Sequence, residues 1–178
     1  MDKARYKQIL EEQEKIRIEE LKDWLKAYQQ NEMVINEKLE KLRTVYASAT
    51  SVSAQEITDM PRAPSNPKDR MADWLVRVDS LERSLELDIA AQEASKKAIE
   101  DLIASLESLK MQKIIRCRYL YGMEWSEVIA EMYREKPDYA AKIRAYERRT
   151  YRDHERALKL MVREWWKKPK KERAGGVK

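Results

Sequence analysis

Four arginines recur near the C-terminal end of the chain at spacings that match the turns of a helix. They are Arg148, Arg149, Arg152 and Arg156. Because residues three and four apart lie on one helical face, several of these side chains are expected to point the same way. Arginine is the residue best suited to bidentate contact with guanine, and it also binds phosphate. The segment therefore predicts a DNA-binding helix whose contacts come from Arg148, Arg149, Thr150, Arg152, Arg156 and Lys159.

Two other interpretations of these arginines are open. They could form ion pairs with Glu147, Asp153 and Glu155 on an exposed helix, although three acids cannot neutralise the positive excess. The net charge is −5 over residues 1–109 and +10 over residues 110–178, within a total of +5. A solvated basic tail would contribute to this asymmetry, but the arginines continue back into a patterned segment. The balance favours a scaffold joined to a nucleic-acid-binding module.

Catalytic chemistry has little to build on in this chain. Cys117 is the single cysteine and His154 the single histidine, so neither a disulfide framework nor a zinc centre is expected. The carboxylates follow helix surfaces, and there is no glycine-rich phosphate loop. Cys117 is expected to be a small core residue, and His154 either touches phosphate or lies on the surface without a role. We predict a binding protein with no catalytic residue, metal or cofactor.

The composition indicates that helices carry these residues. The 178 residues include three glycines, five prolines and no phenylalanine, 39% are charged, and the mean hydropathy is −0.82. So few glycines are hard to reconcile with the turns of a sheet protein, and we predict an all-α fold. No apolar run is long enough for a transmembrane helix, and the first residues lack a signal-peptide core. A cytoplasmic location is expected, with no membrane partner.

The positions of the prolines and glycines indicate the domain boundaries. Amphipathic stripes predict one helix from about residue 3 to 49 and a second from about 67 to 109, joined by a connector at about 48–68. Two such stripes can bury each other by folding back or by pairing between chains, and we interpret residues 1–109 as a long antiparallel helical hairpin. The hairpin would mediate self-association or contact another protein. Residues 167–178 are predicted to be a basic flexible tail.

Residues 110–166 differ from the predicted hairpin in their pattern of apolar and charged residues. A short helix is expected over 110–121, with Gly122 in the position of a C-cap glycine. The following helix places Trp125, Val128 and Ile129 on one face, and Trp125 is interpreted as a core anchor rather than a stacking platform. A long last helix carries the arginines. The motif core is predicted to comprise Leu120, Gly122, Trp125, Ile129, Ala157 and Leu158.

Two blocks of this region resemble sigma-factor region 4-like helix-turn-helix domains. The run from Arg118 to Ala130 is similar to the opening R-Y-L-x-G-x-x-W-x-E-I-A, and the run from Arg149 to Leu158 is similar to the recognition helix R-T-V-Y-R-x-H-x-R-A-L. Upstream, Met60-Pro61-Arg62 followed by Lys68-Asp69-Arg70-Met71-Ala72 resembles the helical leader of small phage proteins of the ArpU/RinA type. The resemblance covers about residues 21–162.

This resemblance implies a transcriptional regulator of phage or prophage late genes, acting in the host bacterial cell on double-stranded DNA. The helical hairpin would then self-associate or contact RNA polymerase. The early place of Arg149 and Arg152 in the motif implies base contacts, whereas Arg156, one turn later, is expected to hold phosphate. A DNA-packaging protein of the terminase small subunit type, or a structural assembly protein, is the alternative.

The chain departs from the family pattern between the two helices of the motif. Residues 133–147 form a longer connection than the few residues that separate the two helices in the family. The insertion would lengthen the recognition helix at its N-terminal end or form an extra turn before it.

Overall fold

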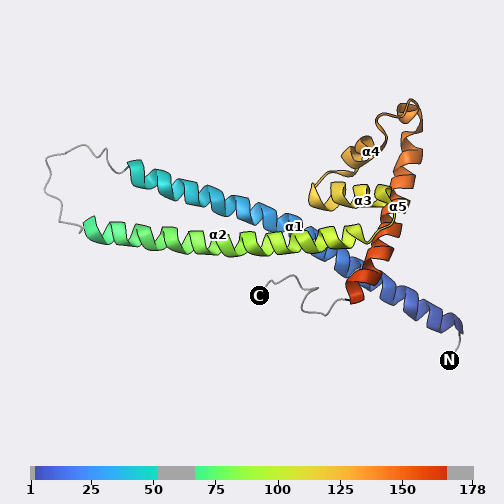
Figure 1. The fold of residues 1–178 in the computed structure, drawn as a ribbon, viewed down its shortest axis with the longest axis horizontal. Coiled ribbons are helices and arrows are strands. Elements are labelled where there is room, and N and C mark those ends of the chain that lie inside the picture. Colours follow the sequence, from blue (N-terminus) through green and yellow to red (C-terminus); the bar gives the residue numbers. More distant parts are fainter. Residues whose placement is uncertain (1–2, 52–66, 168–178) are drawn as a thin grey trace. The chain divides into compact units, whose positions relative to one another are not determined.

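The computed structural model describes residues 3–51 and 67–167, which form helices joined by short turns (Figure 1). In chain order they are α1 (Lys3–Ser51), α2 (Pro67–Ala104), α3 (Leu109–Ile115), the π-helical turn η2 (Arg116–Leu120), α4 (Trp125–Tyr133) and α5 (Tyr139–Lys167). No strand occurs within these ranges, and the all-α prediction is confirmed. Most of the predicted connector and the tail beyond residue 167 lie outside the described residues.

The chain divides into two compact units, and the division does not fall at residue 109 as the sequence predicted. One unit comprises residues 1–30 and 91–178, and the other comprises residues 31–90. Each of the two long helices therefore contributes to both units. The first part of α1 and the last part of α2 belong with the C-terminal helices, so the predicted boundary cuts through a single unit.

The larger of two hydrophobic clusters in this unit joins α1, α2, the α3–η2 segment and α5. Helix α1 contributes residues three or four apart, so that one face of the helix is buried. The end of α2, the α3–η2 segment and the second half of α5 complete the core. Its members are Ile18, Leu21, Leu25, Tyr28, Ile99, Leu102, Ile103, Leu106, Met111, Ile115, Tyr119, Ala157, Leu158, Met161, Val162 and Trp165. The basic helix is thus oriented by residues distant in sequence.

The smaller unit pairs the rest of α1 with the first part of α2. The Tyr46 hydroxyl donates to Glu82 at 2.6 Å, and the Lys38 ammonium contacts both Ser84 and Asp88. Partners of later α1 residues come earlier in α2, so the two helices run antiparallel within this unit. Only Val78 and Leu85 are buried in its described part, which makes its apolar interior small.

Helix α2 ends five residues before the predicted position, at Ala104 rather than near residue 109. The Gln112 side chain donates to the Leu106 carbonyl at 2.7 Å, and the hydroxyl of Ser108 caps the first turn of α3. Leu106 is only 2% exposed and anchors the turn in the core. Because serine at an N-cap favours a new helix start, the chain changes direction here.

Burial of Leu25 predicts that α1 stabilises the C-terminal helices. Leu25 is fully buried in the shared core, whereas Leu75 of α2 is 54% exposed. We expect Leu25→Ala to lower the free energy of unfolding by about 2–5 kcal/mol and Leu75→Ala to change it by less than about 0.5 kcal/mol. Urea denaturation followed by tryptophan fluorescence measures both. Equal, small losses for the two variants would show that α1 does not belong to this core.

Candidate nucleic-acid interface

The chain turns at Gly122, shortly after η2 ends at Leu120, as the sequence predicted. Gly122 has φ of 66°, a left-handed conformation that glycine adopts without a Cβ penalty. The Met123 amide donates to the Cys117 carbonyl at 3.0 Å, which closes the end of the helix. The Gln29 side chain of α1 donates to the Arg118 carbonyl at 2.8 Å and ties this turn to the core. Gly122 is exposed, so it is a turn residue and not part of the motif core.

Helix α4 is joined to the turn and to α5 through Trp125. The Arg118 guanidinium lies 5.3 Å from the centre of the Trp125 ring and donates to the Met123 carbonyl at 2.7 Å. The Trp125 ring also makes edge-to-face contacts with the rings of Tyr151 and His154 of α5, each with ring centres 4.8 Å apart. Trp125 is half-buried and packed on three sides, as expected of an anchor.

The insertion between the two helices of the predicted motif is an ordered element. Residues 134–138 form a turn, and α5 then begins at Tyr139, with non-helical dihedral angles at Lys142. The rings of Tyr133 and Tyr146 stack with their centres 4.3 Å apart, and the Tyr146 hydroxyl donates to Asp138 at 2.6 Å. The insertion thus comprises a turn and the first part of the helix that carries the arginines.

One side of α5 faces the protein and includes a residue that the sequence assigned to DNA. Thr150 is fully buried, and its hydroxyl donates to the Tyr146 carbonyl at 2.8 Å within the helix. The prediction of a DNA contact from Thr150 is therefore wrong, because the small hydroxyl is satisfied locally on the core side. Ala157 and Leu158 are buried on this side, as predicted, and so is Ile129 of α4. Leu120 is half-buried against the core.

The opposite side of α5 is an exposed arginine face. We use this name for Arg144, Arg148, Arg149, Arg152, Arg156 and Arg163, all of which are exposed. At 3.6 residues per turn these positions fall on one side of the helix, away from Ala157 and Met161. Among the residues that the structure describes, no ion pair or side-chain hydrogen bond holds any of these six guanidinium groups.

Three of the four acidic residues of α5 form ion pairs with lysines. Asp153 pairs with Lys110 of α3, and Glu155 pairs with Lys159 at 2.8 Å. Glu164 pairs with Lys167 at 2.7 Å. The interpretation that acids of this helix neutralise its arginines is therefore wrong for Asp153 and Glu155. Lys159, which the sequence grouped with the arginines, is half-buried and already has a carboxylate partner.

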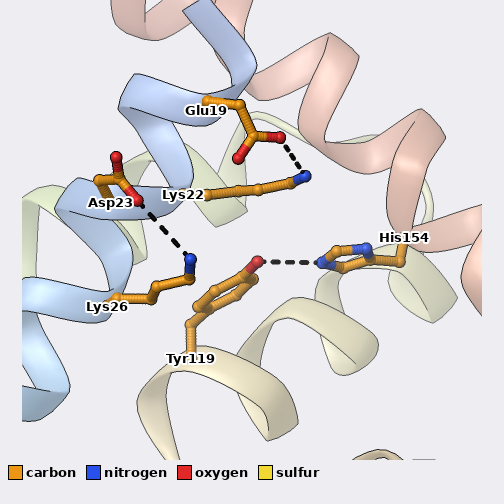
Figure 2. A network of polar contacts seen from close by, with 6 residues as sticks. All are labelled: Glu19, Lys22, Asp23, Lys26, Tyr119 and His154. Atoms are coloured by element: carbon orange, nitrogen blue, oxygen red, sulfur yellow. Dashed lines mark hydrogen bonds and ion pairs between the residues drawn. The ribbon is translucent and has the colours of Figure 1, made fainter. Parts of the chain in front are cut away.

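His154 is buried behind the arginine face, which contradicts both expectations for it. It is 9% exposed, and its Nε2 lies 3.2 Å from the Tyr119 hydroxyl, within hydrogen-bond distance. Figure 2 shows this pair beside the Glu19–Lys22 and Asp23–Lys26 pairs of α1. Burial lowers the pKa of His154 to about 4, and the positive charges of Lys22 and Arg118 act in the same direction. His154 is thus neutral near pH 7 and unavailable to phosphate.

The sequence analysis did not assign two further arginines near this surface, the exposed Arg163 and the half-buried Arg17. Arg163 lies eleven residues after Arg152, a spacing of three turns that extends the arginine face and could have revealed it. Arg17 of α1 lies over the ring of Trp166 at the end of α5, 4.8 Å from the ring centre. No local pattern announces this contact, because it joins residues almost 150 positions apart.

Comparisons with known proteins give no neighbour: no family model, curated protein or solved structure matches the chain. The resemblance to the ArpU/RinA type stays a prediction. In the described ranges, no group of histidine, cysteine and acidic side chains is arranged to hold a metal ion. Cys117 is buried, and burial raises the pKa of its thiol. Among the described helices, none combines the length and apolar character needed to cross a bilayer.

The buried histidine predicts that acid destabilises the larger unit. Because the pKa of His154 falls from 6.5 in the unfolded chain to about 4 in the folded one, the unfolded chain binds a proton first as the pH falls. The contribution of His154 to the free energy of unfolding is nearly complete above pH 6.5 and is lost as the pH falls from 6.5 to 4. We expect a loss of about 2 kcal/mol between pH 7 and pH 5 from this residue.

Urea denaturation at pH 7 and pH 5 measures this loss, with His154→Gln as the control. Glutamine does not titrate, so the variant retains only the pH dependence of the other groups. An identical pH dependence in the two proteins would contradict the burial of a neutral histidine.

Proposed function

We propose that this chain binds double-stranded DNA through the exposed arginine face of α5. The observation that carries the proposal is that six arginines share the solvent side of one helix while three of the four acids of that helix pair with lysines. Unpaired guanidinium groups in water are available to phosphate and to base edges without breaking an existing ion pair. Binding needs no rearrangement of the core behind them.

The positions along α5 suggest different roles for the arginines. Arg149 and Arg152 occur early in the predicted recognition helix and are the candidates for base contacts in the major groove. Arg156, one turn later, is the candidate for phosphate. Such contacts would position the helix, whereas base contacts would give sequence preference.

The regulatory part of the proposal rests on the resemblance in sequence. The first block, Arg118 to Ala130, runs from η2 into α4, and the second, Arg149 to Leu158, lies in the middle of α5, in the order expected of a helix-turn-helix. In this proposal the chain regulates transcription of phage or prophage late genes and performs no catalysis. RNA polymerase is a further proposed partner.

A DNA-packaging or assembly role is the second candidate, and exposed apolar residues favour it. Met33 of α1 and Leu75, Val76 and Leu87 of α2 are between 54% and 72% exposed in the smaller unit. Exposed apolar residues on a pair of long helices are suited to self-association. Mass measurement in solution separates the candidates, since a ring of eight or more chains supports packaging and a monomer or dimer supports regulation.

Arginine variants of α5 test the proposed DNA contacts. We expect Arg149→Ala or Arg152→Ala to cost about 1–3 kcal/mol of binding free energy and to reduce discrimination between a selected and a scrambled duplex. Arg156→Ala should weaken binding to both duplexes alike. Fluorescence anisotropy titration of labelled duplexes, chosen by selection from fragments of the parent genome, measures both quantities.

The matched control is Arg43→Ala in the smaller unit. Arg43 is exposed and pairs with Glu40 at 3.3 Å, so the variant changes the net charge equally but leaves the arginine face intact. Affinities of all three α5 variants equal to that of the control would remove α5 as the DNA-binding helix.

A further inference from the structure

A groove lies where the start of α1 passes the end of α5, both within the larger unit. Its volume is about 470 Å³, and its walls include Leu10 and Arg17 from α1 with Arg163 and Trp166 from α5. The two helices are joined beside it by the Arg17–Trp166 contact and by Trp24 against Trp165, with ring centres 6.0 Å apart. The side chains of the groove therefore lie on a firmly packed support.

The charged lining of the groove comprises three cations, Arg17, Arg163 and Lys167, and one acid, Glu14. Lys167 lines it as well, but its ammonium pairs with Glu164. Glu14 is the acid in the lining, and the pKa of Lys159 is raised chiefly by Glu155 with a smaller contribution from Glu14. Within the described residues, neither Arg17 nor Arg163 has a carboxylate partner. The groove consequently favours an anionic occupant.

The groove continues the arginine face of α5. Arg163 belongs to both, and it follows Arg152 by about 16 Å along the helix axis at 1.5 Å per residue. The major groove of DNA is about 12 Å wide. If Arg152 contacts a base edge in the major groove of DNA, Arg163 lies beyond the edge of the major groove, at the level of the flanking phosphates. Arg17 then stands next to the same strand.

The geometry points to Arg17 of α1 and Arg163 of α5 as a phosphate-backbone clamp on duplex DNA, an inference that rests on the proposed function. The clamp holds the strand that flanks the groove entered by α5. It gives α1 a part in DNA binding, although the sequence predicted DNA contacts only between Arg148 and Lys159. Because the ligand is the phosphate backbone, the clamp acts on every DNA sequence alike.

An acidic amphipathic segment of a protein is the competing occupant. Leu10 is 48% exposed beside the groove, and Tyr6 is 56% exposed one turn earlier on α1. The continuity of positive charge from Arg148 to Arg163 favours DNA, because a duplex on the arginine face extends past the end of α5. A separate protein partner would need none of that continuity.

The test is the salt dependence of binding to a duplex of mixed sequence, measured by anisotropy with the full chain. Each phosphate contact contributes about −0.9 to the slope of log affinity against log salt concentration. We expect Arg163→Gln and Arg17→Gln each to make the slope shallower by about one, and the double variant by about two. Arg163→Lys keeps the charge and should restore most of the slope. Arg43→Ala is the control for net charge.

Thermal unfolding of each variant shows whether the fold is retained, and Arg163→Gln is the decisive variant because that side chain is exposed. Slopes unchanged in Arg163→Gln and in the double variant, while Arg152→Ala weakens binding, would overturn the clamp and leave the proposed function standing. If the variants keep the salt slope of the parent chain but differ from it in mass in solution, the groove would be assigned to a protein partner. Failure of the parent chain to bind the duplex at all would overturn the proposed function together with the clamp.

Discussion

The buried side of α5 determines which of its charged residues reach solvent. Leu158 and Met161 pack against side chains from α1, α2 and α3, and the core that they share is built from segments far apart in sequence. Rotating α5 by a third of a turn would bury arginine and expose leucine. At about 25 cal/mol for each Å² of apolar surface, such a rotation would lose several kcal/mol before any charge was desolvated. The arginine face therefore follows from hydrophobic packing.

Polar contacts at the border of the core fix α5 further. Asp153 pairs with Lys110, and His154 lies beside the Tyr119 hydroxyl, so two successive residues of α5 each contact the α3–η2 segment. The pKa of Tyr119 is raised to about 12 by burial, and the hydroxyl remains protonated beside the neutral imidazole. A buried pair of this kind needs no counter-ion. The arginines on the other side of α5 are therefore the charges of this helix that remain available for binding.

Much of this fold is encoded locally and could be predicted from the sequence. Gly122 follows the end of a helix in a left-handed conformation that glycine adopts without a Cβ penalty, and the spacing of Ala157 and Leu158 placed both residues in the core. Thr150 and His154 were assigned to the surface because residue type alone does not reveal burial. Their environment depends on α1 and the α3–η2 segment, and no local signal records that packing. The unit boundary was misplaced for the same reason, because residues 18–28 belong to a core completed more than 70 positions later.

The central claim is that the unpaired arginines of α5 contact DNA. Protection of these arginines by DNA from an arginine-specific reagent tests the claim most directly. The full chain is modified with phenylglyoxal, with and without duplex DNA, and each modified arginine is located by mass spectrometry. DNA is predicted to protect Arg148, Arg149, Arg152 and Arg156, whereas Arg43 and Arg83 in the smaller unit are modified equally in both conditions. Equal modification of the α5 arginines in both conditions, or protection confined to Arg173 beyond the end of α5, would contradict DNA binding through this face.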